Sequence, residues 1–331
     1  MKSRKKGKSS CLSTLLTIVL CALVGMLIGA TAQRIINAQK PLYHTEDDGH
    51  GGVIITDYNE TLLNDAELVI PAEIDGKRVT AIGEGAFFWN KHAVNVTIPE
   101  GVTSIGRHAF SGMPKLEHIN IPDSVVHIDK YAFSHNNSLI SVTLPANFTE
   151  IGESWFYFDR KLEEITIPEG VTAIGTGAFW YCKSLTRVEL PEGLESIGQQ
   201  AFEHCTSLTQ IDLPKSLKEI ASYAFANTGL ISVDLPEGIT AIEASTFEGC
   251  INLTSVRIPD SVTAIYTDAF KKCTSLESLT IPDSVTYISP IDFLSSTFPE
   301  GTVIRCNEGS YAAQWCEEND FTTAPIETDG I

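Results

Sequence analysis

The sequence predicts a repeat solenoid, a curved rod of about ten 23-residue units made of short β-strands, turns and short helical segments and capped at both ends. Two periodic series predict this fold. Proline recurs from Pro99 to Pro282 and phenylalanine from Phe87 to Phe293, each with a period of 23 residues and a single interval of 22. The phenylalanines are Phe87, Phe110, Phe133, Phe156, Phe179, Phe202, Phe225, Phe247, Phe270 and Phe293. A fixed period in the twenties is typical of solenoids, which present long surfaces and usually bind rather than catalyse.

Each part of the unit has a physical role, which is clearest in residues 97–122. Ile119 and Ile121 are two positions apart and place apolar side chains inward from one strand. Pro122 ends that strand because it lacks an N–H donor. The Pro-x-Gly or Pro-x-Ser pattern favours a type I turn with Pro at its second position. From Ala109-Phe110 we expect a short helical or 3₁₀ segment that places Phe110 in the core.

The ends of the chain differ from the repeat. Basic residues precede an apolar run from Cys11 to about Ala32, which predicts a signal peptide cleaved after Ala32 or, alternatively, an uncleaved membrane anchor. Both alternatives export the rest of the chain. We expect a linker over 33–52, the solenoid with its N-terminal cap over 53–301, and a C-terminal cap and tail over 302–331. A short closing helix is predicted at 309–315.

The charge balance limits the kinds of binding partner that the chain can have. The formal net charge is −19, and residues 1–32 hold five basic and no acidic residues, which leaves 18 basic and 42 acidic residues beyond them. Such an acidic surface disfavours nucleic acid and anionic lipid, so membrane contact is expected only through the N-terminal segment if it stays uncleaved. No catalytic, cofactor-binding or metal-binding constellation is apparent, so we predict a protein that is not an enzyme.

The cysteines follow two patterns. Cys182, Cys205, Cys250 and Cys273 each lie three residues after a periodic phenylalanine and therefore form one ladder of equivalent positions, called the cysteine ladder. We expect them to be buried thiols, with disulfides between neighbouring repeats as the alternative. Cys306 and Cys316 lie outside the repeat, where a disulfide in an oxidising compartment and free thiols are both open.

The repeated pattern I-P-x-x-V-x-x-I-G-x-x-A-F, followed by C-x-x-L-x-x-[VI], resembles the unit of the BspA-type (treponemal) leucine-rich repeat family. The resemblance covers about residues 53–321. It implies a curved solenoid on the surface of a bacterium or a parasitic protist, and adhesion to host matrix proteins, host cells or other microbes. It implies no catalytic residues.

Two surfaces are candidate binding sites. After most periodic phenylalanines the next two residues are polar or small, but Phe88-Trp89, Tyr157-Phe158 and Trp180-Tyr181 are aromatic, and Trp155 replaces a usual alanine. If these residues face water, they form an aromatic patch that suits protein or sugar ligands. The alternative is that the rings fold over the flank of the solenoid.

The second candidate is a polar ribbon along the exposed strand positions, which includes His118, Arg187 and Arg257. Its alternative is an ordinary solvated sheet face. We therefore predict an exported or surface-displayed, adhesin-like binding protein that recognises protein or glycan ligands, possible partners being a host matrix or a cell surface. The alternative from another class is a structural spacer or envelope scaffold without a specific ligand.

Overall fold

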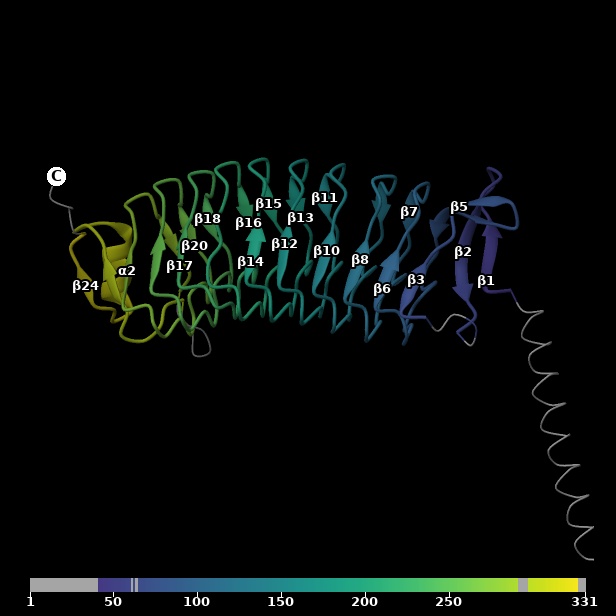
Figure 1. Ribbon diagram of the computed structural model, residues 1–331. Helices are drawn as coiled ribbons and strands as arrows, with labels where there is room; N and C mark the ends of the chain where they lie inside the picture. Colours follow the sequence, from purple (N-terminus) through teal and green to yellow (C-terminus); the bar gives the residue numbers. More distant parts are fainter. Residues whose placement is uncertain (1–40, 61, 63–64, 291–296, 327–331) are drawn as a thin grey trace, which may run out of the picture.

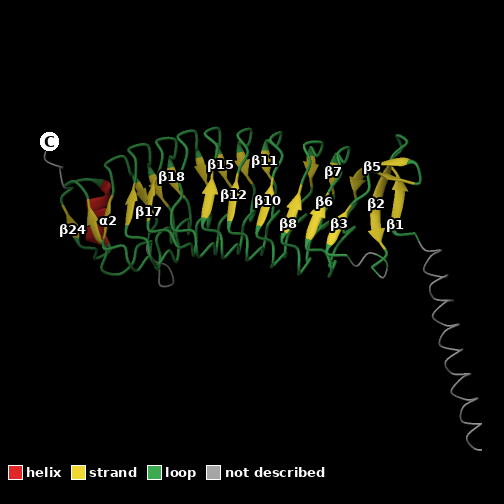
Figure 2. Ribbon diagram, in the orientation of Figure 1, coloured by secondary structure: helices red, strands yellow, loops and turns green. Residues whose placement is uncertain are grey.

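The computed structural model describes residues 41–60, 62, 65–290 and 297–326, which form one elongated solenoid (Figure 1). The predicted signal or anchor segment, 1–32, lies outside the described residues. Each repeat has three sides. One side carries a three-residue strand and is called the sheet face. The second carries a two-residue strand, and the third, called the turn side, is the stretch with the periodic phenylalanine that leads to the next three-residue strand. Figure 2 shows how much of each repeat is turn.

The strands of neighbouring repeats pair in parallel and in register, so that Ile119 lies between Val96 and Val142. The strands of the sheet face are β3 (Glu67–Val69), β6 (Asn95–Thr97), β8 (His118–Asn120), β10 (Ser141–Thr143), β12 (Glu164–Thr166), β14 (Arg187–Glu189), β17 (Ser232–Asp234), β19 (Ser255–Arg257), β21 (Ser278–Thr280) and β23 (Val303–Arg305). Those of the second side are β7 (Ser104–Ile105), β9 (His127–Ile128), β11 (Glu150–Ile151), β13 (Ala173–Ile174), β15 (Ser196–Ile197), β16 (Glu219–Ile220), β18 (Ala241–Ile242), β20 (Ala264–Ile265) and β22 (Tyr287–Ile288).

The core is a column of phenylalanine rings along the rod. From Phe87 to Phe298 the rings are fully buried, and successive centroids lie 5.2 to 6.0 Å apart with near-parallel planes. Such offset stacking adds to the gain from burial, by about 0.5–1.5 kcal/mol per pair. Phe293, the predicted tenth member, lies outside the described residues, and Phe298 takes the place next to Phe270.

Aromatic caps close both ends of this column. At one end, β1 (Tyr43–Asp47) pairs with β2 (Val53–Tyr58), and the ring of Tyr58 stacks on Phe87 at 5.4 Å. The cap continues through β4 (Glu73–Ile74) and β5 (Lys77–Ile82). At the other end, α2 (Tyr311–Glu318) and β24 (Thr323–Ala324) follow β23, and the indole of Trp315 meets Phe298 edge-on at 5.5 Å. Each cap covers a ring face that no further repeat would cover.

Three local predictions are wrong. Residues 43–47 were expected in a linker but form β1, because they pair with β2. No helix occurs on the turn side of the described repeats, since left-handed residues such as His108 (φ 54°) interrupt each turn. The proline is the first residue of its turn and not the second, because its carbonyl accepts the hydrogen bond of residue i+3, as in Leu194 N to Pro191 O at 3.1 Å.

Within the described residues, no helix has the length and apolar character needed to cross a bilayer.

Candidate functional site

The aromatic residues of the predicted patch form a row on the turn side. His135, Phe158, Tyr181 and His204 are spaced by 23 residues, and their ring centroids are separated in turn by 5.5, 4.4 and 4.2 Å. Each of the four has a left-handed backbone (φ 61–65°). The N–H of each of the four donates to the next repeat, as from Phe158 to Trp180 O at 2.8 Å. Hydrogen bonds between repeats therefore hold a conformation that these residues rarely adopt.

A second row runs beside the first. The ring of His108 stacks on Tyr131 at 5.2 Å, Tyr131 meets Tyr157 edge-on at 6.2 Å, and Tyr157 contacts Trp180 at 5.2 Å. Phe88 joins this row through His108 at 6.0 Å. We call both rows together, with Trp89, the aromatic band.

The aromatic band is only partly exposed where the sequence predicted the patch. Tyr157, Phe158, Trp180 and Tyr181 are half-buried, because neighbouring rings cover their faces. The most exposed pair is Phe88-Trp89, at 48% and 54%.

Trp155 was predicted in the patch but is buried, with 3% of its surface exposed. It packs edge-on against Phe148 at 5.4 Å, and a Cβ at Gly152 would collide with its indole nitrogen. Gly152 therefore leaves room for an indole where other repeats place alanine, and Trp155 belongs to the core.

Sequence reasoning missed His108, Tyr131, His135 and His204 as members of the aromatic band. A signal was present, because each lies 23 residues from another aromatic residue or histidine of the same row. Burial lowers the pKa of His108, His135 and His204, so the neutral imidazole is favoured at these stacked positions.

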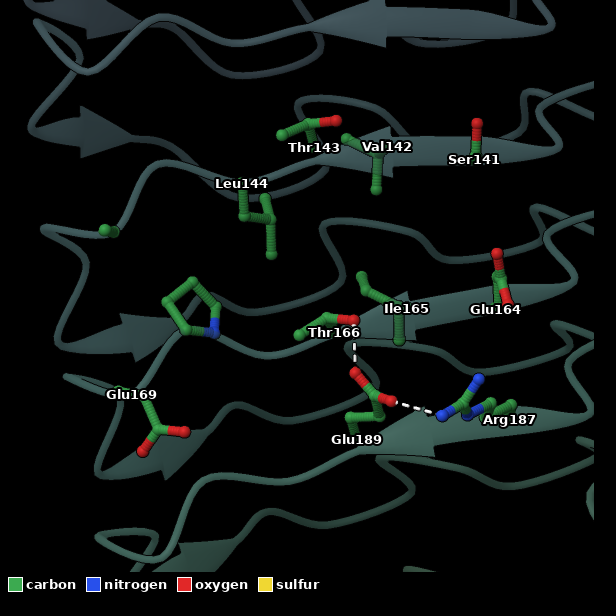
Figure 3. Close-up of a pocket in the computed structure, with 12 residues that line it drawn as sticks. Ser141, Val142, Thr143, Leu144, Glu164, Ile165, Thr166, Glu169, Arg187 and Glu189 are labelled. Carbon is green, nitrogen blue, oxygen red and sulfur yellow. Dashed lines mark hydrogen bonds and ion pairs between the residues drawn. The ribbon is translucent and has the colours of Figure 1, made fainter.

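The sheet face is hollowed over its middle repeats. A hollow of about 580 Å³ lies over β10, β12 and β14. Figure 3 shows that the Thr166 hydroxyl donates to Glu189, which also pairs with Arg187 of the same strand, β14. Two more hollows continue along the face as far as β17.

The hollows coincide with interruptions in the sheet. Among the described residues, no strand pairing joins β10 to β12, and residues 210–212, between β14 and β17, form no strand. In three of these repeats Leu144, Leu190 and Leu213 occupy the strand end and are half-buried, whereas the equivalent Ile121 and Ile167 are 3% and 2% exposed. The face therefore offers apolar floor beside charged side chains, a combination that suits recognition of a ligand.

The three sheet-face candidates lie apart. Arg187 lines the first hollow. His118 is exposed on β8, and its Nδ1 lies 2.9 Å from the hydroxyl of Ser141 at the rim of that hollow. Arg257 lies on β19 outside the hollows, where it contacts Leu235 O and Glu237.

The cysteines are all free and buried among the described residues. Each thiol of the ladder donates to the carbonyl of a phenylalanine in the preceding repeat, as from Cys182 to Phe156 O at 3.1 Å. This confirms the prediction of buried thiols. Cys306 and Cys316 are also free thiols, so the disulfide alternative is not realised. The described residues include no group of three His, Cys, Asp or Glu residues suited to a metal ion.

The family model for the BspA type leucine-rich repeat region matches residues 67–186 and 172–298. The chain belongs to this family. Two solved structures share the architecture at 25% identity. One is a leucine-rich cell surface protein from Faecalibacterium prausnitzii A2-165, with a TM-score of 0.50 over 87% of this chain and 98% of that one. The other is a leucine-rich repeat protein from Bacteroides ovatus ATCC 8483, with a TM-score of 0.52 over 87% and 99%. No curated protein matches the chain.

Proposed function

We propose that this BspA-type chain is an exported, surface-displayed binding protein that recognises a protein or glycan ligand without catalysis. The similarity to the F. prausnitzii protein, which is described as a cell surface protein, supports the location. The apolar N-terminal run after basic residues supports export.

The hollow over β10, β12 and β14 is the observation that carries the binding role. In other repeats the apolar residue at the strand end is buried, as Ile121 and Ile167 are, whereas Leu144, which lines this hollow, is half-buried. Arg187 and Glu189 lie in the same hollow and offer both charges for orientation of a ligand.

The test compares ligand binding by the purified protein and by an Arg187→Ala, Glu189→Ala variant against matrix proteins and an array of glycans. Loss of at least tenfold in affinity for a ligand found in the screen is expected. The matched control is Arg257→Ala, on the same face outside the hollows, which should bind unchanged. A ligand that the double variant binds as well as the parent refutes the hollow as the site, and absence of any ligand favours a spacer.

A further inference from the structure

Positive charge gathers on one side of this acidic rod. Between residues 92 and 183 the chain has six Lys and Arg residues, and all six lie on the turn side of their repeats: Arg107, Lys115, Lys130, Arg160, Lys161 and Lys183. All six are exposed. One repeat after Lys183 the equivalent position is Thr206, so the basic segment ends at Lys183. Over the same residues the turn side also carries five carboxyl groups, Glu117, Asp129, Glu153, Asp159 and Glu163, so its cations exceed its acidic groups by one, whereas the whole chain has a net charge of −19.

Three of these cations lie against the aromatic band. The guanidinium carbon of Arg160 lies 5.0 Å from the ring centroid of Phe158, and the ammonium of Lys183 lies 5.6 Å from that of Tyr181. Arg107 approaches Tyr131 at 6.0 Å. These distances are in the range of cation–π attraction. The attraction restricts each cationic side chain, while its N–H groups remain in contact with water.

These cations also lack carboxylate partners. Lys130 contacts Glu153 at 3.9 Å, but the described part of the chain gives Arg107, Arg160 and Lys183 no ion pair. Some cations elsewhere in the described residues are paired, as Lys218 is with Glu195 at 2.8 Å. An unpaired cation retains its donors for an external anion, and charge-assisted hydrogen bonds to anionic oxygens are the strong ones.

The rings favour an anion over a neutral sugar. A sugar ring binds an aromatic side chain through its exposed face, but Phe158 and Tyr181 each lie between two other rings of the row from His135 to His204. The edges are what this row presents outward, and the edge of an aromatic ring carries partial positive charge. Ring edges and cations are therefore electrostatically complementary to the same negative groups.

We propose that the basic segment of the turn side binds a linear anionic polysaccharide, whose sulfate or carboxylate groups lie against Arg107, Arg160 and Lys183. Arg160 and Lys183 occupy adjacent rungs, since Ser184 N donates to Arg160 O at 3.1 Å, so an elongated ligand meets one cation per repeat. The proposal rests on the proposed binding role but not on the sheet-face hollow. Nucleic acid is the less favoured polyanion, because its charge density, about one charge per 1.7 Å of duplex, meets repulsion from the acidic remainder of the chain.

The test measures the affinity of the purified protein for a heparin octasaccharide by titration calorimetry at several salt concentrations. The variant Arg107→Gln, Arg160→Gln, Lys183→Gln is expected to bind at least tenfold more weakly. Its slope of log K against log salt should be smaller by about three, one per lost contact. A neutral dextran oligosaccharide of similar length should not bind.

The matched control removes three exposed cations from other repeats, Lys215→Gln, Lys218→Gln and Lys272→Gln, and should bind within twofold of the parent. Equal weakening in both triple variants would show only a net-charge effect and would overturn the proposal. Tighter binding of a single-stranded DNA oligonucleotide than of the octasaccharide would overturn it as well. A protein that binds a ligand through the Arg187 hollow but no octasaccharide refutes this inference and leaves the proposed function standing.

Discussion

Asp159 is a buried carboxyl group that lowers the stability of the fold. It occupies the ladder position that Cys182 fills in the next repeat, and its exposed fraction is 0%. Its Oδ1 accepts from Asn136 N at 2.7 Å, whereas its Oδ2 has no hydrogen-bond partner. Burial raises the pKa of Asp159 well above its usual range.

The change Asp159→Asn should stabilise the protein at pH 7. The amide oxygen keeps the bond to Asn136 N, and the amide nitrogen meets the carbonyl of Phe133 just as Asn136 Nδ2 meets Phe110 O at 2.9 Å. Removing an unsatisfied buried oxygen is worth about 1–3 kcal/mol. For a chain of this size each kcal/mol raises Tm by about 2–4 °C.

The stability gained from Asp159→Asn should depend on pH. Burial raises the pKa of Asp159 in the folded state, so folding favours the protonated carboxyl group. Its contribution to stability is fully present below the pKa of 3.8 in the unfolded state and is lost as pH rises through the pKa of the folded state. The gain in Tm from Asp159→Asn should therefore be large at pH 7 and small near pH 3.5, as measured by calorimetry at both pH values. Asp123→Asn, at an exposed position, is the matched control. A variant that is less stable than the parent at pH 7, or a gain that is the same at both pH values, refutes the reasoning.

Three further predictions follow from the core. Phe179→Ala removes one ring of the central column and should cost about 3–5 kcal/mol in urea unfolding, whereas Phe88→Ala, at an exposed site, should cost far less; similar losses would contradict the column as the main core. Gly152→Ala should lower stability by about 1–3 kcal/mol in the same assay, because its Cβ collides with Trp155, and a neutral result would mean that the indole can move. Cys250, whose pKa burial raises to about 11, should resist iodoacetamide at pH 8 until denaturant is added, as read by mass spectrometry; alkylation in the folded protein would contradict its burial.

Most of the fold could be predicted from the repeat, because the apolar residues of one repeat can be buried only when equivalent repeats stack on both sides of it. The column of rings, the buried thiols, the strand at 53–58 and the helix near 311–318 were all predictable from spacing and residue type. The strand at 43–47 was not, since its charged and polar residues carry no strand pattern and pair only because β2 is there.

The candidate sites were predictable only in outline. The sequence marked Tyr157-Phe158 and Trp180-Tyr181 as exceptions to the repeat, and they do lie together. By itself it determined the solenoid and the acidic character of the chain. Only the tertiary structure decided that Trp155 is core, that the aromatic rings hide their faces against one another, and that the sheet opens beside Arg187. Those outcomes depend on side-chain packing within and between repeats, where the volume of one side chain sets the space left to its neighbour, as Gly152 does for Trp155.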